Sequence, residues 1–200
     1  MSGIEHEIKK DIYLFTASGF FDKEDIFEEI SDLYYDHQIS HQIINSFIEE
    51  AFKNKLQEEK SYPHFTDCDR LKKVFDILYL DHQILAMHLA GLNDYEGEED
   101  VFDWYFEEKE NDKTPIGYCF YNQQDIDDLI EKKSNTLQLA FGDFTFVKEL
   151  ELNKNKDLSI NIGIKIIEIL KTQNFETRWD GNYYSKIEVL NFNWQNRLEN

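Results

Sequence analysis

The chain has 200 residues and a mass of 24.0 kDa, and its 21 Lys and Arg against 41 Asp and Glu give a formal net charge of −20. Apolar residues make up 41% of the chain, which is enough for a packed core and argues against intrinsic disorder. No apolar run approaches the roughly 20 residues of a membrane helix, and the first residues lack the basic and apolar regions of a signal peptide. We therefore expect a cytoplasmic protein that does not contact a membrane.

The negative charge is concentrated in the first two thirds of the chain. Residues 1–131 hold 32 acids and 11 bases, a net charge of −21, whereas residues 132–200 hold 9 acids and 10 bases, a net charge of +1. Such a surface repels phosphate backbones and anionic lipids, which disfavours a nucleic-acid or membrane partner and favours a basic protein partner. The alternative is that the acidity only keeps the protein soluble.

A helical segment is predicted for residues 1–62. Apolar residues at steps of four and three predict a first helix that ends at Gly19. Asp22 and Ser40 are placed to cap a second and a third helix, and Pro63 ends the block.

From residue 63 onward, helices are predicted to alternate with strands. Thr66 and Asp69 nearly form a capping box for a fourth helix over about 67–80, and a short buried strand over 84–89 follows. The next predicted helix covers 98–110 and turns its acids outward. Its inward residues are predicted to be Val101, Phe102, Tyr105 and Phe106.

The last third is richer in strands. A strand over 116–121 precedes a short helix capped by Asn122, and alternation from Leu137 to Phe141 predicts another strand, with 144–152 as a possible hairpin partner. The segment 160–170 fits both an alternating strand and a helix, and its length favours the helix. Two further strands, 175–179 and 185–194, flank a turn at Asp180-Gly181.

These elements predict an α+β fold. An N-terminal helical segment, residues 1–62, is expected to pack on a mixed β-sheet covered by helices, residues 63–200. Neither a flexible linker nor an internal repeat separates the two parts.

Four ordered motifs run through residues 62–197, and their polar residues recur among the site candidates below. The motifs are Thr66-Asp67-Cys68-Asp69-Arg70-Leu71, Gly117-Tyr118-Cys119-Phe120-Tyr121-Asn122-Gln123-Gln124-Asp125, Leu139-Ala140-Phe141-Gly142 and Trp179-Asp180-Gly181. In this order they resemble a bacterial family known only as a domain of unknown function. The resemblance implies a soluble protein with no assigned activity, and it supplies no functional residue.

The resemblance also implies that this chain lacks a metal site found in its relatives. Many of them carry a cysteine-rich stretch after the strand that corresponds to 84–89, and often a histidine at the position of Asn122. Here residues 85–89 contain no cysteine.

The polar motif residues have two interpretations. In one, carboxylates beside an arginine line a pocket that binds a ligand or performs acid–base chemistry. In the other, they cap helices, form ion pairs and close a turn. The candidate ligand-binding residues are Asp67, Asp69, Arg70, Tyr118, Gln124, Asp125, Trp179 and Asp180.

We expect no catalytic residue, metal or cofactor. His37 and His41 are four residues apart, as are His64 and Cys68, but these pairs need not share a helical face, and the chain has no Cys-x-x-Cys pair. Phosphate-binding loops, dinucleotide fingerprints, Gly-x-Ser-x-Gly and His-Glu-x-x-His are also absent from the sequence.

The stretch 94–131 holds 14 acids and two bases. If Trp104 projects on the acidic side, the combination suits an interface with a basic partner; if it points inward, the stretch is a solvated helix face. The candidate partner-binding residues are Glu98, Glu99, Asp100, Asp103, Trp104, Glu107 and Glu108.

The leading hypothesis is an acidic binding protein that inhibits a basic partner, for example an immunity protein that neutralises a basic toxin. The alternative is a small enzyme or ligand-binding domain whose pocket is built from the motif residues. Mimicry of nucleic acid is a third interpretation, and it requires the carboxylates of 94–131 to repeat at phosphate-like spacing.

Overall fold

A computed structural model of the chain describes residues 3–37, 39–144 and 156–198. It divides into two compact units, one formed by Met1–Thr66 with Trp194–Asn200 and the other by Asp67–Asn193. The C-terminal segment of the chain thus belongs to the helical first unit. In the described parts of the chain, no helix is both long and apolar enough to cross a lipid bilayer.

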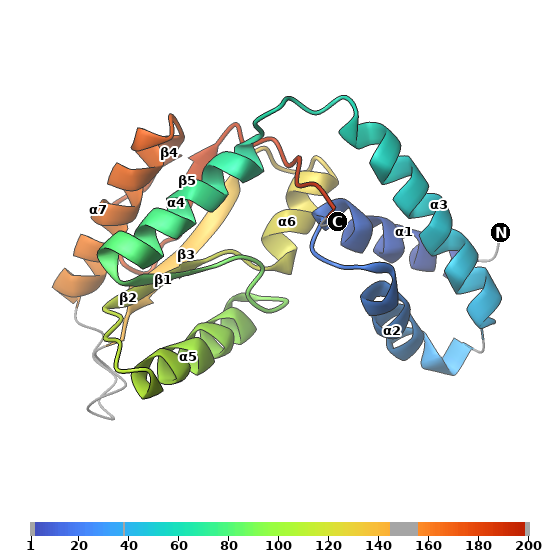
Figure 1. The fold of residues 1–200 in the computed structure, drawn as a ribbon, viewed down its shortest axis with the longest axis horizontal. Coiled ribbons are helices and arrows are strands. Elements are labelled where there is room, and N and C mark those ends of the chain that lie inside the picture. The colour runs from blue at the N-terminus through green and yellow to red at the C-terminus, as the bar shows by residue number, and fades with distance from the viewer. Residues whose placement is uncertain (1–2, 38, 145–155, 199–200) are drawn as a thin grey trace. The chain divides into compact units, whose positions relative to one another are not determined.

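The first unit is helical, as predicted (Figure 1). It contains α1 (Gly3–Ser18), α2 (Lys23–Leu33), the 3-10 turn η1 (Tyr35–His37) and α3 (His41–Glu59). Gly19 ends α1 with a φ of +82°, and Asp22 and Ser40 accept hydrogen bonds from the first backbone amides of α2 and α3. Each helix contributes isoleucines four residues apart to one core: Ile8, Ile12, Ile26, Ile30, Ile44 and Ile48. The periodicity and the caps therefore predicted the three helices α1, α2 and α3 correctly.

The second unit is a five-stranded mixed sheet with helices packed on it. Its elements are α4 (Asp67–His82), β1 (Ile84–Met87), α5 (Asp94–Glu110), β2 (Gly117–Phe120), α6 (Gln123–Ile130), β3 (Leu137–Asp143), α7 (Lys156–Thr172), β4 (Glu176–Arg178) and β5 (Ile187–Leu190). The strand order in the described residues is β1-β2-β3-β5-β4, with β1 and β2 parallel and the other pairs antiparallel. The predicted mixed α and β composition is confirmed.

Helices cover both faces of this sheet: α4 and α7 lie on one face and α5 on the other (Figure 1). Alternate residues of β2 show why both faces must be covered. Tyr118 and Phe120 pack with Val101 of α5, whereas a Cβ added at Gly117 would lie 2.2 Å from the Cδ1 of Ile162 in α7. A strand buried on both sides needs apolar or very small residues throughout, and β2 has them.

Three predicted boundaries were wrong. The predicted strand 185–194 ends at Leu190, where β5 stops before Asn191 with its φ of +53°. β1 ends at Met87 rather than at residue 89, because Leu89 has a φ of +53° and cannot continue the strand. α5 begins at Asp94 rather than at residue 98, with Asn93 as its N-cap. The earlier start was not predicted because glycine disfavours a helix. A glycine is nevertheless required at position 97, since a Cβ there would lie 2.4 Å from the ring of Phe120.

The ambiguous segment 160–170 is helical, as predicted, and lies within α7. Ile162, Ile166 and Ile169 are buried on one side of the helix, whereas Ile164 is exposed. The predicted hairpin partner 144–152 lies, after its first residue, outside the described residues.

Candidate functional site

The first motif joins the start of α4 to two distant segments of the second unit. The guanidinium of Arg70 pairs with Asp67, donates to the backbone oxygen of Gln173 at 3.0 Å and lies 4.5 Å from the ring centre of Phe175. The other oxygen of Asp67 accepts a hydrogen bond from the backbone N–H of Asn193 at 3.0 Å. This pair therefore connects α4 to the segments that precede β4 and follow β5. Asp69 lies in the same first turn of α4.

The second motif places Tyr118 inside the core between β2 and α5. Its hydroxyl donates to the carboxylate of Glu98 at 2.9 Å, and burial, followed by the negative charge of Glu98, raises the pKa of Tyr118. The phenol therefore stays protonated and acts as a fixed donor. This contact holds the middle of α5 against the sheet.

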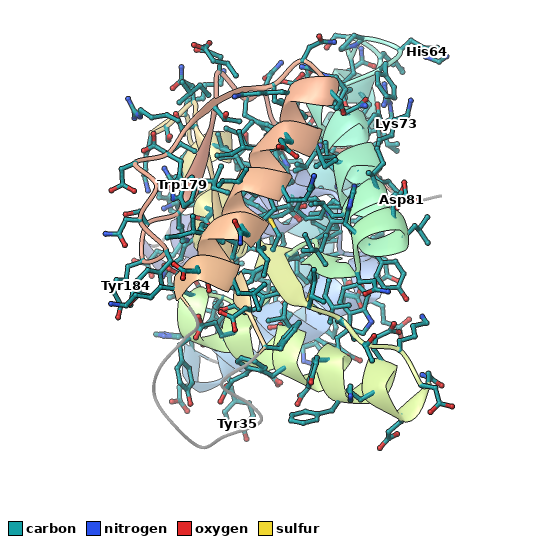
Figure 2. The ribbon with its side chains drawn as sticks, turned by 90° about the vertical axis from the view of Figure 1, so that its left-hand side faces the viewer. Tyr35, His64, Lys73, Asp81, Trp179 and Tyr184 are labelled. Carbon is teal, nitrogen blue, oxygen red and sulfur yellow. The ribbon has the colours of Figure 1, made fainter. Side chains whose placement is uncertain are left out.

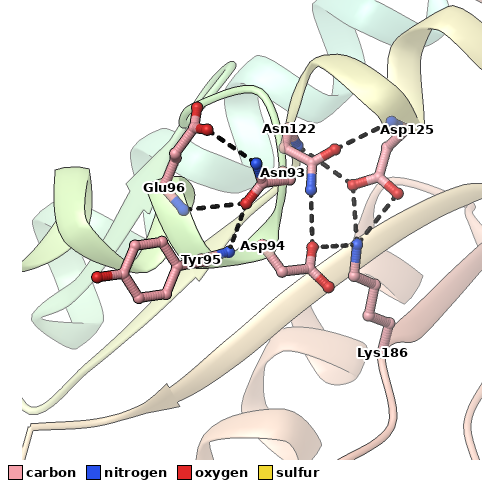
Figure 3. Close-up of polar contacts among 7 residues, drawn as sticks. All are labelled: Asn93, Asp94, Tyr95, Glu96, Asn122, Asp125 and Lys186. Atoms are coloured by element: carbon pink, nitrogen blue, oxygen red, sulfur yellow. Dashed lines mark hydrogen bonds and ion pairs between the residues drawn. The ribbon is translucent and has the colours of Figure 1, made fainter.

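The same motif ends in a polar network that joins three elements (Figure 3). The side chain of Asn122 accepts from the backbone N–H of Asp125 at 3.1 Å and donates to Asp94 at 2.7 Å. The ammonium of Lys186 lies 3.1 Å from both oxygens of Asp125 and 2.5 Å from Asp94. The network thus connects the starts of α5 and α6 to the residue before β5.

The environment of Asp125 contains opposing influences. Burial raises the pKa of Asp125, while the charge of Lys186 and the backbone hydrogen bond from Asn122 act to lower it. The cluster has two carboxylates and one ammonium, so Lys186 compensates one of the two negative charges. The arrangement is suited to fixing the N-terminus of α5.

The last motif forms the loop between β4 and β5. The ring centre of Trp179 lies 5.4 Å from that of Phe141, its indole N–H donates to the oxygen of Asn182, and it lies beside α7 in Figure 2. Asp180 accepts from the backbone of Asn182 at 2.9 Å and from the hydroxyl of Ser185 at 3.2 Å. These contacts close the predicted turn.

The eight candidate ligand-binding residues do not meet in one cleft. Asp67 and Arg70 contact residues at one end of the β4–β5 hairpin. Trp179 and Asp180 lie at its other end, as does Lys186, which pairs with Asp125. The remaining three differ in burial: Tyr118 is in the core, Asp69 is half-buried on α4, and Gln124 is exposed on α6.

The outer side of α5 is strongly acidic, and we call it the acidic face. Its exposed acids are Glu99, Asp100, Asp103, Glu107 and Glu110, and Lys109 is the exposed base of this helix. Two large aromatic side chains are exposed among these acids: Tyr95 at 71% and Phe106 at 52%. The hydroxyl of Tyr95 is hydrogen-bonded to Glu99, which raises the pKa of Tyr95.

The structure shows the directions of two aromatic side chains of α5, Phe106 and Trp104. Phe106 was expected to point inward, but it is exposed, and its ring centre lies 5.5 Å from that of the buried Tyr105. Trp104 is half-buried and packs 5.2 Å from the ring centre of Tyr79, so it does not project among the acids. The aromatic residues of the acidic face are therefore Tyr95 and Phe106.

Two acids among the candidate partner-binding residues also face inward. Glu98 is half-buried and bonded to Tyr118, and Glu108 is only 7% exposed. The ammonium of Lys113 lies 3.1 and 2.8 Å from the two oxygens of Glu108. The hydroxyl of Tyr79 donates a hydrogen bond to the carboxylate of Glu108 at 3.1 Å. The hydrogen bonds to Glu108 and Tyr79 raise the pKa of Lys113.

One histidine and one cysteine of the second unit, His88 and Cys119, are largely shielded from solvent. The ring of His88 stacks on Phe75 at 4.5 Å, its Nδ1 lies 2.7 Å from the hydroxyl of Tyr121, and burial lowers the pKa of His88 to about 4. Burial also raises the pKa of the Cys119 thiol. Among residues 3–37, 39–144 and 156–198, no three His, Cys, Asp or Glu side chains are grouped to hold a metal ion.

The fold and these contacts define a mixed α/β protein whose motif residues hold elements together. The chain belongs to the family described as Domain of unknown function (DUF6891), which it matches over residues 2–198. The resemblance predicted from the motifs is thus confirmed at the level of an uncharacterised family, and the match extends over the helical segment that the motifs did not cover. The comparisons with curated proteins and with solved structures each return no match.

Proposed function

We propose that this protein binds a basic protein partner on the acidic face of α5. The observation that carries the proposal is the composition of that face: five exposed acids, one exposed base and the exposed rings of Tyr95 and Phe106. Acidic groups accelerate encounter with a positively charged surface, and aromatic rings supply apolar area that is buried on binding. The specific form that we favour is an immunity-type inhibitor of a basic toxin in the bacterial cytoplasm.

Anchoring of α5 supports the proposal because a preorganised surface loses less conformational entropy on binding. Its inward acids are all engaged: Asp94 pairs with Lys186, Glu98 accepts from Tyr118 and Glu108 pairs with Lys113. These contacts occur in the first, second and last turns of the helix. The outward acids are thereby presented on a helix that is fixed near both ends.

The experiment compares two charge-reversal variants of equal net charge. Asp103→Lys with Glu107→Lys reverses two acids of the acidic face, and Asp76→Lys with Asp81→Lys reverses two exposed acids of α4 as the matched control (Asp81 is labelled in Figure 2). Wild type and the control are expected to capture the same basic protein from a lysate of the native host, and the α5 variant is expected to lose it.

The captured partner then provides a rate measurement. The association rate constant with wild type should fall about tenfold or more between low salt and roughly 0.5 M salt, because the attraction is screened over a few ångströms at high ionic strength. Equal capture by the two variants, or an association rate that does not change with salt, would contradict the proposed function.

A further inference from the structure

A cavity of about 360 Å³ lies at the C-terminal end of α5. The last turn of α4 contributes Tyr79 and Leu80 to its walls, and the start of β1 contributes Leu85. Gln83, Glu108 and the segment 112–115 complete the lining. The cavity therefore has one polar wall around Glu108 and one apolar wall.

A cation already occupies the polar wall. The ammonium of Lys113 contacts both oxygens of Glu108, lies 2.6 Å from the hydroxyl of Tyr79 and lies 5.1 Å from the centre of the same ring. Glu108 is 7% exposed, whereas the side chain of Lys113 is 54% exposed. The acceptor is thus a fixed part of the core, and the cation reaches it from the solvent side on a flexible stem.

Three further features of the cavity favour a cation. The acidic residue Asp112 is part of its lining. The C-terminus of α5 carries the negative end of the helix dipole. The ring of Tyr79 offers its face to a positive charge. Leu80, which is 74% exposed, and Leu85 provide apolar contact for an alkyl stem.

We propose that this cavity binds the side chain of an arginine or lysine of the basic partner, and that Lys113 is a built-in competitor that the incoming side chain displaces. The polar wall receives the guanidinium or ammonium group, and the apolar wall receives its alkyl chain. The inference rests on the proposed function for the identity of the partner. The cavity itself is tested without the partner.

The probe is agmatine, an alkylguanidinium, titrated calorimetrically into the full-length protein, with a neutral alkylurea of the same length as the control ligand. Lys113→Met removes the competitor, and Lys109→Met removes a lysine of the same charge from the exposed surface of α5. Lys113→Met should bind agmatine about tenfold more tightly than wild type, because the charge-assisted contacts to Glu108 become available. Lys109→Met should bind it as wild type does, and the alkylurea should not bind.

Adding Glu108→Gln to Lys113→Met should remove the gain in affinity. Since that change alters a buried group, a second measurement is independent of it: in Lys113→Met, agmatine should shift the backbone amide signals of Leu85 and Thr114, which line the cavity. Equal gains in the Lys113 and Lys109 variants, no binding, or signal changes elsewhere in the protein would overturn the cation site.

The two proposals fail separately. If agmatine binds in the cavity but reversal of Asp103 and Glu107 leaves capture unchanged, the proposed function falls and with it the assignment of the cavity to a partner. If agmatine does not bind while the reversal abolishes capture, the acidic face stands and the cavity proposal falls.

Discussion

Replacing Arg70 by Met should destabilise the second unit and leave partner binding unchanged. Met keeps an apolar stem over Phe175 but removes the ion pair with Asp67 and the hydrogen bond to the oxygen of Gln173. The side chains of Arg70 and Asp67 are 28% and 19% exposed, so the loss lies between that of a surface pair and that of a buried pair. We expect the free energy of unfolding to fall by about 2 kcal/mol.

The assay is urea unfolding of the full chain, followed by tryptophan fluorescence and far-UV circular dichroism. Arg178→Met is the matched control, because Arg178 pairs with Glu188 on an edge strand with 71% of its side chain exposed. That variant should unfold at the urea concentration of wild type. If the two variants lose the same small stability, the structural role assigned to Arg70 is wrong. If Arg70→Met keeps its stability but loses partner capture, Arg70 belongs to a binding site.

Two further predictions concern the core of the second unit. Gly117→Ala should lower the free energy of unfolding by about 2 kcal/mol in the same assay, since its Cβ would meet Ile162 and the oxygen of Gly142; an unchanged midpoint, as expected for Gly3→Ala, would contradict the packing. The pKa of His88 is about 4 in the folded protein and 6.5 ordinarily, so the unfolded chain binds more protons between these pH values. Stability should therefore decrease as the pH falls from 6.5 to 4, by on the order of 3 kcal/mol relative to His88→Gln, and parallel pH profiles of the two proteins would refute this.

Local signals in the sequence were sufficient for most of the fold. Asp22, Ser40 and Asn122 were identified as caps because a short polar side chain before an apolar stripe satisfies the first amides of a helix. The start of α5 was missed because a glycine in a sequence suggests a loop. Only the structure shows that the ring of Phe120 occupies the space that a side chain at Gly97 would need. The strand order could not be predicted, since it depends on pairings between strands far apart in the sequence.

The direction of side chains on α5 was predicted less well, for a related reason. Its buried stripe includes Glu108 as well as Val101 and Tyr105, so the apolar pattern of the sequence does not mark the inner side. Glu108 can be buried because Tyr79 and Lys113 supply its hydrogen bonds. Tyr79 is 29 residues away in the chain, and only the fold brings it into contact.

The polar motif residues and the acidic face differ in where their partners lie. Arg70 reaches a carbonyl 103 residues further on, and Lys186 reaches a carboxylate 61 residues back, so these side chains fix the relative positions of distant elements. Groups engaged in this way cannot rearrange around a substrate without loosening the sheet. The outward acids of α5 carry no such constraint on the fold, and Asp103 and Glu107 can be reversed without breaking a contact between elements. A surface that is free to change while its support is fixed is the arrangement that recognition of another protein requires.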